Sequence, residues 1–382
     1  MQFTKLVLQN WMNFRNVDVP LRERIFVVGP NASGKSNLLA AFRFLRDVAE
    51  ARGGLQYAVE KLGGMSSIRS LHARRHPEVV LDVEMSLDDK AWRYRLVLAQ
   101  NNQRRVIVKE ENVWRAGDRI LTRPDRDDEA DAGRLAQTHL EQVSANAEFR
   151  DVQSFFAQVR YLHIVPQLIR DPERYMRQNG GHDPFGGDFL EQLARMQKEQ
   201  RRTFDSRLKR LNEALKVAVP QFRELKLERD EAGRPHLRAL FEHWRPEAGW
   251  QNEEQFSDGT LRLLGLLWAL LDGTRPLLVE EPELSLHEAV VRHLTSMMWK
   301  ATRKNRRQLF VSTHSAALLS DKGIAPEEVL LLTPSPQGTS VIRAAESREI
   351  LALLESDLSM GEAVLPRVAP PRPEQLLLGF AD

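Results

Sequence analysis

The segment from Gly29 to Ser36 reads G-P-N-A-S-G-K-S, which has the residue types and spacing of a loop that binds nucleotide phosphates. Its glycines allow a tight turn, so that successive backbone N–H groups point at phosphate oxygens. A helix that begins at the end of the loop adds the positive end of its dipole to the same site. We expect Lys35 to reach the β- and γ-phosphates of ATP and Ser36 to hold Mg²⁺ through its hydroxyl.

The residues on either side of this loop predict the strand and the helix that must position it. Residues 24–28 (RIFVV) form an apolar run of strand type, and residues 37–45 (NLLAAFRFL) favour a helix. A glycine-rich turn that matched the motif by chance would need neither flank, so the flanks favour nucleotide binding. The expected contacts of this segment with ATP are Asn31, Ala32, Ser33, Gly34, Lys35, Ser36 and Asn37.

A second group of chemically capable residues follows another apolar strand, where residues 275–283 read RPLLVEEPE. In a protein with a phosphate-binding loop, the first carboxylate after such a strand orients Mg²⁺, and the next one polarises the attacking water. These positions are Glu280 and Glu281. A strand followed by an acidic surface turn is the alternative interpretation.

Two further segments are weak when taken singly. Residues 256–262 (FSDGTLR) place Ser257 and Gly259 at the start of a helix, where a serine can also be an ordinary N-cap. Residues 308–313 read as a strand that delivers His314, which can also be an ordinary loop histidine. The order of the four segments along the chain is more informative than any one of them.

In this order, the motifs GPNASGKSN, FSDGTLR, LLVEEPELSLHE and VSTHSAALL resemble those of a RecF/SMC-type member of the ABC ATPase superfamily. The chain is similar to the stand-alone AAA-family ATPases of bacteria, which are related to overcoming-lysogenization-defect-type ATPase heads. The motifs span residues 29–319, and the opening LQNWMNFR of residues 8–15 also fits. The resemblance implies an α/β P-loop NTPase of ABC-ATPase head type, with a mixed sheet core, a flanking antiparallel sheet and a helical signature lobe.

The resemblance also implies a homodimer in which each ATP lies between the phosphate-binding loop of one subunit and the signature helix of the other. The implied catalytic residues are Glu281, His314 and Lys35. The implied contacts from the second subunit are Ser257, Gly259 and Thr260. The implied ligands of the metal are Ser36, Glu280 and Gln167, and Gln167 and Arg15 are further implied contacts with the nucleotide.

This sequence departs from the superfamily pattern at two places. Position 280 is glutamate where aspartate is usual, which moves the metal-side carboxylate by one methylene, so we expect slow hydrolysis. The signature reads S-D-G-T rather than S-G-G-Q, which suits the DNA-repair and defence branch better than transporters.

Patterning along the chain predicts four parts. We expect a nucleotide-binding lobe at 1–167, a helical lobe with the signature at 168–272, the acidic strand and switch histidine at 273–345, and a C-terminal helix and tail at 346–382. Period-two alternation in residues 79–109 predicts an antiparallel sheet. The polar segment 115–135 reads as a surface loop, and residues 186–219 read as one or two amphipathic helices.

Composition excludes several classes of function. The chain of 382 residues has no cysteine, so disulfides and thiol catalysis are excluded. Its longest apolar run, residues 261–271, is too short to span a bilayer and contains Arg262. We therefore expect a soluble, cytoplasmic protein without a membrane partner.

The leading hypothesis for function is an ATP-switched dimer that acts in DNA repair or antiphage defence by controlling DNA or a separate nuclease or effector protein. The alternatives are the ATP-binding subunit of a membrane transporter, or a non-hydrolysing ATP-dependent scaffold that regulates a toxin or effector. The arginines and lysine at 303, 304, 306 and 307 and the arginines at 69, 74 and 75 are candidate DNA contacts, with a solvated helix end as the alternative for the first cluster. The formal net charge of +2 is too small to identify a nucleic-acid-binding protein by itself.

Overall fold

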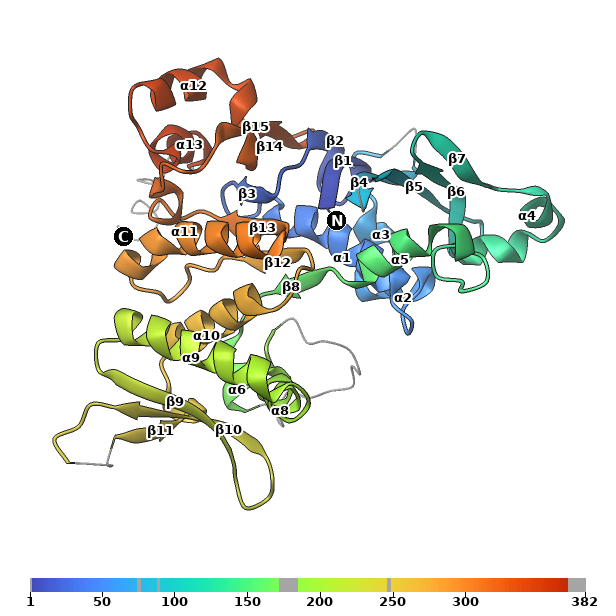
Figure 1. Cartoon of the computed structure of the whole chain (residues 1–382). Helices are drawn as coiled ribbons and strands as arrows, with labels where there is room; N and C mark the ends of the chain where they lie inside the picture. The colour runs from blue at the N-terminus through green and yellow to red at the C-terminus, as the bar shows by residue number, and fades with distance from the viewer. Residues whose placement is uncertain (1, 74–76, 88–89, 172–184, 246–248, 370–382) are drawn as a thin grey trace, which may run out of the picture. The chain divides into compact units, whose positions relative to one another are not determined.

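The computed structural model describes residues 2–73, 77–87, 90–171, 185–245 and 249–369. The chain forms two compact units (Figure 1). Unit 1 comprises Met1–Arg160, Thr274–Leu278 and Thr302–Asp382, and unit 2 comprises Tyr161–Gly273 and Val279–Ala301. Unit 1 therefore carries the phosphate-binding loop and His314, whereas unit 2 carries the acidic pair and the signature segment.

The first sheet is antiparallel, with its six strands in the order β2-β1-β4-β5-β6-β7. The strands are β1 (Gln2–Trp11), β2 (Phe14–Pro20), β4 (Val79–Leu87), β5 (Lys90–Gln100), β6 (Val106–Arg115) and β7 (Asp118–Arg123). This is the flanking antiparallel sheet that the alternation predicted.

The second sheet is mixed, with its six strands in the order β15-β14-β3-β13-β12-β8. The strands are β3 (Arg24–Val28), β8 (Arg160–Leu162), β12 (Leu277–Glu280), β13 (Leu309–Thr313), β14 (Val329–Ser335) and β15 (Gly338–Arg343). Strand β3 is parallel to β13 and β14, and β15 is antiparallel to β14. Every residue of β3 is buried, as expected for a parallel strand covered on both faces. The predicted mixed core is confirmed.

Helix α1 (Lys35–Ala49), which follows the phosphate-binding loop, packs between the two sheets of unit 1. The ring of Phe42 in α1 lies 4.8 Å from Phe3 of β1 and 4.6 Å from Phe310 of β13, measured between centroids. Helix α5 (Arg150–Ala157) adds Phe155, whose ring lies 4.7 Å from Phe3. Buried aromatic rings contribute large apolar areas and specific edge contacts. This cluster therefore fixes α1, and with it the loop, against both sheets.

Other helices of unit 1 are α2 (Leu55–Lys61), α3 (Met65–Ile68), α4 (Arg126–Ala130), α12 (Arg348–Glu355) and α13 (Met360–Val368), and α11 (Glu288–Asn305) begins in unit 2 and ends in unit 1. The short 3₁₀ turns are η1 (Ala132–Ala136), η2 (Ala147–Phe149), η3 (Glu253–Gln255), η4 (Leu318–Ser320), η5 (Pro326–Glu328) and η6 (Ala344–Glu346). Among the residues placed by the structure, no helix combines the length and apolar character that crossing a membrane requires.

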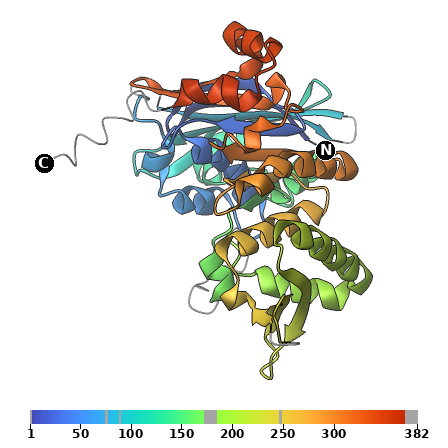
Figure 2. The same cartoon turned by 90° about the vertical axis from the view of Figure 1, so that its left-hand side faces the viewer.

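Unit 2 contains helices and a small sheet (Figure 2). Its helices include α6 (Pro166–Arg170), α8 (Phe189–Glu199), α9 (Arg201–Ala218) and α10 (Asp258–Leu271), so the predicted helices at 186–219 are confirmed. Its antiparallel sheet has the order β11-β10-β9, from β9 (Phe222–Arg229), β10 (Pro235–Phe241) and β11 (Trp250–Asn252).

The helical lobe expected at 168–272 also contains this small sheet, which the sequence did not indicate. Leu225 and Leu227 are buried with a half-buried lysine between them, which is a strand pattern that the charged residues around it obscured. The side chain of Asn212 in α9 accepts from the Leu225 N–H at 2.7 Å and donates to the Leu225 carbonyl at 3.2 Å. A helix side chain therefore satisfies the backbone of strand β9.

The prediction of a surface loop at 115–135 was wrong, because the segment contains β7, α4 and most of η1, and Arg123 and Asp128 within it belong to a buried ion network. Arg123 at the end of β7 donates to both carboxylate oxygens of Asp128, each at 2.8 Å, and to Glu111 at 3.0 Å. All three side chains are at most 1% exposed. Glu111 also accepts from the backbone N–H groups of His139 and Leu140. The network thus anchors residues 123–140 to β6.

The hydrogen bonds from Arg123 lower the pKa of Asp128 to about 2 from its usual 3.8. We expect Asp128→Asn to lower the free energy of unfolding at pH 7 by about 3 kcal/mol, because it removes one partner of a buried ion pair. A group whose pKa is lower in the folded state than in the unfolded state stabilises the fold at pH values above its unfolded-state pKa. This stabilisation is lost as pH falls through the folded-state pKa. The difference between wild type and variant in urea unfolding should therefore shrink as pH falls from 3.8 towards about 2.

Asp127→Asn is the matched control, because the Asp127 side chain is exposed and pairs only loosely with Arg134, at 3.4 Å. We expect a change below about 1 kcal/mol for it. Equal effects of the two variants, or a difference that does not depend on pH, would contradict the role of this network.

Candidate nucleotide site

The phosphate-binding loop connects β3 to α1 and has the backbone shape that an anion site needs. Ala32 and Gly34 adopt left-handed conformations, with φ of 62° and 97°. The N-cap residue of α1 is Gly34, which has no side chain to cap the first N–H groups of the helix. The first N–H groups of a helix have no intrahelical acceptor, and together with the helix dipole they favour a bound anion. The loop therefore fits the phosphates that its sequence predicted.

Lys35 and Ser36 lie where this loop meets the helix. The Lys35 side chain is folded over the loop, and its ammonium donates to the carbonyls of Gly29 at 3.0 Å and Pro30 at 3.2 Å. Ser36 is exposed in the first turn of α1. A cation held over the loop and an exposed hydroxyl are the groups that a Mg²⁺–nucleotide requires here.

The other predicted contacts of the loop differ in exposure. Asn31 and Ala32 are exposed, whereas Ser33 is buried. The hydroxyl of Ser33 has no hydrogen-bond partner within the described part of the chain. Asn31 and Ala32 are thus on the surface, and Ser33 supports the loop from inside.

Asn13, in the turn between β1 and β2, holds the loop in this shape. Its side-chain nitrogen donates to the Ser33 carbonyl at 2.9 Å and to the Thr339 hydroxyl at 2.8 Å, and its oxygen accepts from Asn37 at 2.8 Å. A Cβ atom at Gly34 would lie 2.2 Å from the Asn13 side-chain nitrogen. Gly34 is therefore required both by its φ angle and by this close contact.

Two neighbours of Asn13, Trp11 and Arg15, differ in their contacts with the loop and its helix. The indole N–H of Trp11 donates to the Asn37 carbonyl at 2.8 Å, which ties β1 to the first turn of α1. Arg15, the residue that the resemblance implied, is exposed on β2. The hydrogen bond to the loop comes from Asn13 instead, and its position in LQNWMNFR gave no sign of this role.

His314 follows β13, which runs parallel to β3. Thr313 pairs with Val28, the last residue of β3, so the chain leaves both strands at the same edge of the sheet. His314 is exposed just beyond that edge. Within unit 1, the structure thus brings His314 and the phosphate-binding loop to one edge of the mixed sheet.

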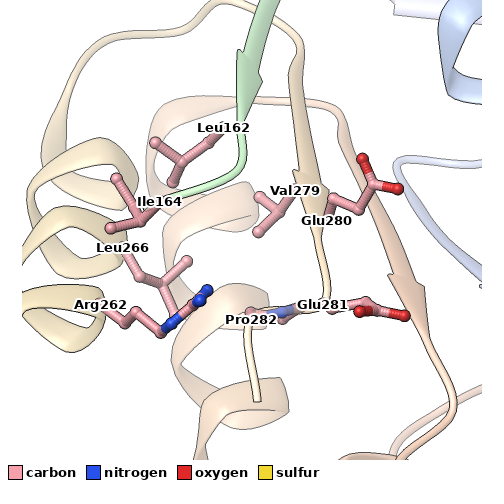
Figure 3. A pocket seen from close by; sticks show the side chains of 8 residues that line it. All are labelled: Leu162, Ile164, Arg262, Leu266, Val279, Glu280, Glu281 and Pro282. Carbon is pink, nitrogen blue, oxygen red and sulfur yellow. The ribbon is translucent and has the colours of Figure 1, made fainter. Parts of the chain in front are cut away.

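In unit 2, the carboxylates of Glu280 and Glu281 lie on the same side of the chain (Figure 3). Consecutive residues of a strand normally point to opposite sides. Glu281 departs from the strand because its φ is 44°, in the left-handed region. Strained backbone of this kind costs of order 1–3 kcal/mol and is concentrated at functional sites. The left-handed turn therefore explains how two adjacent residues can present their carboxylates together.

An apolar recess lies on the other side of this turn and is lined in part by Leu162, Ile164 and Leu266 (Figure 3). Its volume of about 10 Å³ leaves room for about one water molecule. Arg262 of the signature helix also lines it, and the Nε of Arg262 is buried without a hydrogen-bond partner among the described residues. Burial lowers the pKa of Arg262, while the charges of Asp258 and Glu281 act in the opposite direction.

Ser257 is the N-cap of the signature helix α10. Its hydroxyl accepts from the Thr260 N–H at 3.1 Å and lies 2.8 Å from the Thr260 hydroxyl. Ser257 is exposed, whereas Thr260 is buried. A Cβ atom at Gly259 would lie 2.4 Å from the carbonyl of Ser285, so the turn after the acidic pair requires glycine here. Glycine is thus required at position 259 for packing, in addition to the contact with nucleotide that the resemblance implied.

Gln167 is exposed in the short helix α6. Arg170 at the other end of α6 donates to the Phe256 carbonyl at 2.7 Å and to the Asp258 carboxylate at 2.5 Å. Asp258 is the residue at which the signature departs from the usual glycine. It therefore has a partner that links the Gln167 helix to the start of the signature helix, and sequence reasoning missed this contact.

The basic cluster at 303–307 is only partly available for binding phosphates. Arg307 is 2% exposed, and its Nε donates to the Arg275 carbonyl at 2.6 Å. Arg303, Lys304 and Arg306 are exposed. The residues at 74 and 75 lie outside the described part of the chain. The expectation for Arg307 is therefore corrected, because this side chain has a structural role.

The fold and the loop geometry are those of a P-loop NTPase with the architecture of an SMC head. The chain belongs to the family described as "AAA domain, putative AbiEii toxin, Type IV TA system", whose model matches residues 24–320. No curated protein sequence matches the chain.

Solved structures of SMC heads share the fold. An Smc head bound to the C-terminal winged-helix domain of ScpA aligns with a TM-score of 0.54 at 15% identity, covering 90% of this chain and 98% of that one. A Pyrococcus furiosus Smc head with an extended coiled coil, bound to the C-terminal domain of ScpA, aligns with a TM-score of 0.53 at 14% identity, covering 92% and 99%. A Pyrococcus yayanosii Smc head with a coiled coil and joint gives 0.50 at 12% identity, covering 93% and 99%.

The hydrogen bonds by which Asn13 holds the phosphate-binding loop, here called the Asn13 clamp, predict an effect on nucleotide affinity. We expect Asn13→Ala to weaken ATP binding about tenfold, because the loop loses hydrogen bonds worth about 1 kcal/mol each and becomes free to move. Isothermal titration calorimetry with ATP and Mg²⁺ measures this. Asn16→Ala is the control, since Asn16 is exposed on β2, the strand that follows the Asn13 turn. Equal affinities of Asn13→Ala and wild type would contradict the clamp.

Proposed function

We propose that this chain binds ATP with Mg²⁺ and hydrolyses it slowly, and that ATP joins two copies of the chain head to head. The observation that carries the proposal is the uncapped N-terminus of α1 behind a left-handed loop, with Lys35 folded over it. His314 at the same edge of the sheet supports a site that distinguishes ATP from ADP.

The roles that we propose within one chain are those that the resemblance implies. Lys35 and the loop N–H groups bind the phosphates, with Asn31, Ala32 and Asn37 around them. Ser36, Glu280 and Gln167 would hold Mg²⁺, which when bound neutralises phosphate charge. Glu281 would accept the proton of the attacking water, and His314 would contact the γ-phosphate. Arg15 stays a candidate contact with the nucleotide.

The second chain would contribute its signature helix. Ser257 is exposed at the N-terminus of α10, where the helix dipole favours a negative charge. Gly259 has no side chain, so the backbone there could approach the phosphate closely. Thr260 holds the Ser257 hydroxyl in place. The γ-phosphate of an ATP bound by one chain would thus be covered by the signature helix of its partner, which makes association depend on ATP.

We further propose that this dimer acts in DNA repair or antiphage defence, by controlling DNA or a partner nuclease or effector. The S-D-G-T signature supports this branch. Binding of a partner protein also agrees with the Smc heads of this fold, which were solved bound to domains of ScpA. A second candidate is a scaffold that binds ATP without hydrolysing it, which the glutamate at position 280 favours.

The solution mass of wild type and Glu281→Gln, each with and without ATP and Mg²⁺, tests the head-to-head dimer. We expect Glu281→Gln to form a stable dimer only with ATP, because nucleotide binds but is not cleaved. Ser257→Arg in this background should abolish the dimer, because it places a bulky cation at the end of the signature helix. Ser356→Arg, at an exposed position of unit 1, should leave it intact.

If the solution mass of the protein does not change when ATP is added, although calorimetry shows that ATP binds, the head-to-head dimer is contradicted. An ATP-dependent dimer with no measurable turnover in wild type would favour the scaffold over the slow ATPase.

A further inference from the structure

Glu280 is held by a buried tyrosine of the neighbouring strand. Tyr161 lies in β8, next to β12 in the mixed sheet, and is 3% exposed. Its hydroxyl donates a hydrogen bond to a carboxylate oxygen of Glu280. Both residues belong to unit 2. Leu162, the next residue of β8, and Glu280 both line the recess, and the Glu280 carboxylate points away from Leu162 (Figure 3).

Phe185 packs edge-on against the ring of Tyr161. The centroid of the Phe185 ring lies 6.4 Å from that of Tyr161 and 6.2 Å from that of His163, with the planes at 88° in both cases. The Phe185 carbonyl accepts from the Val165 N–H at 2.9 Å. Edge-to-face contacts of this kind restrict ring orientation. The tyrosine hydroxyl is therefore presented from a defined position.

The chemistry of this contact suits a carboxylate that faces a metal ion. A phenol that donates to a carboxylate occupies one acceptor position and orients the group, and outer-sphere hydrogen bonds of this type tune metal binding. Glutamate has one more rotatable bond than aspartate and loses more side-chain entropy when it is ordered. A fixed donor offsets part of this cost for Glu280.

We propose that Tyr161 is a positioning residue that orients the Glu280 carboxylate as a ligand of the metal ion that binds with the nucleotide, and that the two residues act as a matched pair. This inference rests on the proposed function, because it requires that a divalent metal binds with the nucleotide. It adds a residue that explains how glutamate serves at a position where aspartate is usual.

The pairing is tested by a double-mutant cycle on metal affinity rather than on turnover. Mn²⁺ binding to the full chain with a non-hydrolysable ATP analogue is measured by electron paramagnetic resonance for wild type, Tyr161→Phe, Glu280→Asp and the double variant. We expect Tyr161→Phe to weaken Mn²⁺ binding about tenfold in the wild-type background. In the Glu280→Asp background it should change binding less than about twofold, because the shorter side chain no longer uses the tyrosine.

Two further variants exclude a purely structural effect. Tyr57→Phe, in unit 1, removes the hydroxyl of a partly exposed tyrosine and should leave Mn²⁺ affinity unchanged. Phe185→Leu removes the ring that seats Tyr161 without touching Glu280, and should weaken Mn²⁺ binding in the same direction as Tyr161→Phe. It also provides a measurement if Tyr161→Phe does not fold.

The outcomes separate the inference from the proposed function. If Tyr161→Phe leaves Mn²⁺ affinity unchanged, or weakens it equally in both backgrounds, the pairing is wrong while nucleotide binding stands. If the wild-type chain binds no ATP analogue, the proposed function fails and the inference fails with it.

Discussion

The hydrogen bonds of Asn13 are the constraint on which the nucleotide site depends. An asparagine in the β1–β2 turn simultaneously holds the loop carbonyl of Ser33, the side chain of Asn37 and the hydroxyl of Thr339. The aromatic cluster around Phe42 fixes α1 behind the loop. An anion site made from backbone N–H groups works only if the backbone is held in shape beforehand, because ordering a flexible loop would oppose binding. The two sheets of unit 1 can be understood as the support for this loop.

Unit 2 places two adjacent carboxylates on the same side of the chain at the end of a strand. The left-handed backbone of Glu281 makes this possible, and Tyr161 supplies the hydrogen bond for Glu280. Contacts within the same unit also join the acidic turn to the signature helix, since Gly259 lies against Ser285. The turn after the acidic pair and the start of the signature helix are therefore packed directly against each other.

The sequence allowed the motifs and the fold class to be predicted because their information is local or lies in their order. The loop, its strand and its helix occupy adjacent residues, and alternation marks the antiparallel sheet. What was missed depends on distant residues: Asn13 and Thr339 are separated by 326 positions. The buried Arg123 network was missed because its residues look like those of a polar loop. The β9–β11 sheet was missed because charged residues separate its buried leucines.

Because the chain has no cysteine, crosslinking between engineered cysteines tests the central claim of a shared ATP site most directly. Asn31→Cys and Gln255→Cys, each in the Glu281→Gln background, place one thiol on the phosphate-binding loop and one beside the signature; both positions are exposed. With a short bis-maleimide, a mixture of the two variants should form a crosslinked dimer only with ATP and Mg²⁺, and neither variant alone should do so. Absence of an ATP-dependent crosslink in the mixture, although ATP binds, would contradict the account.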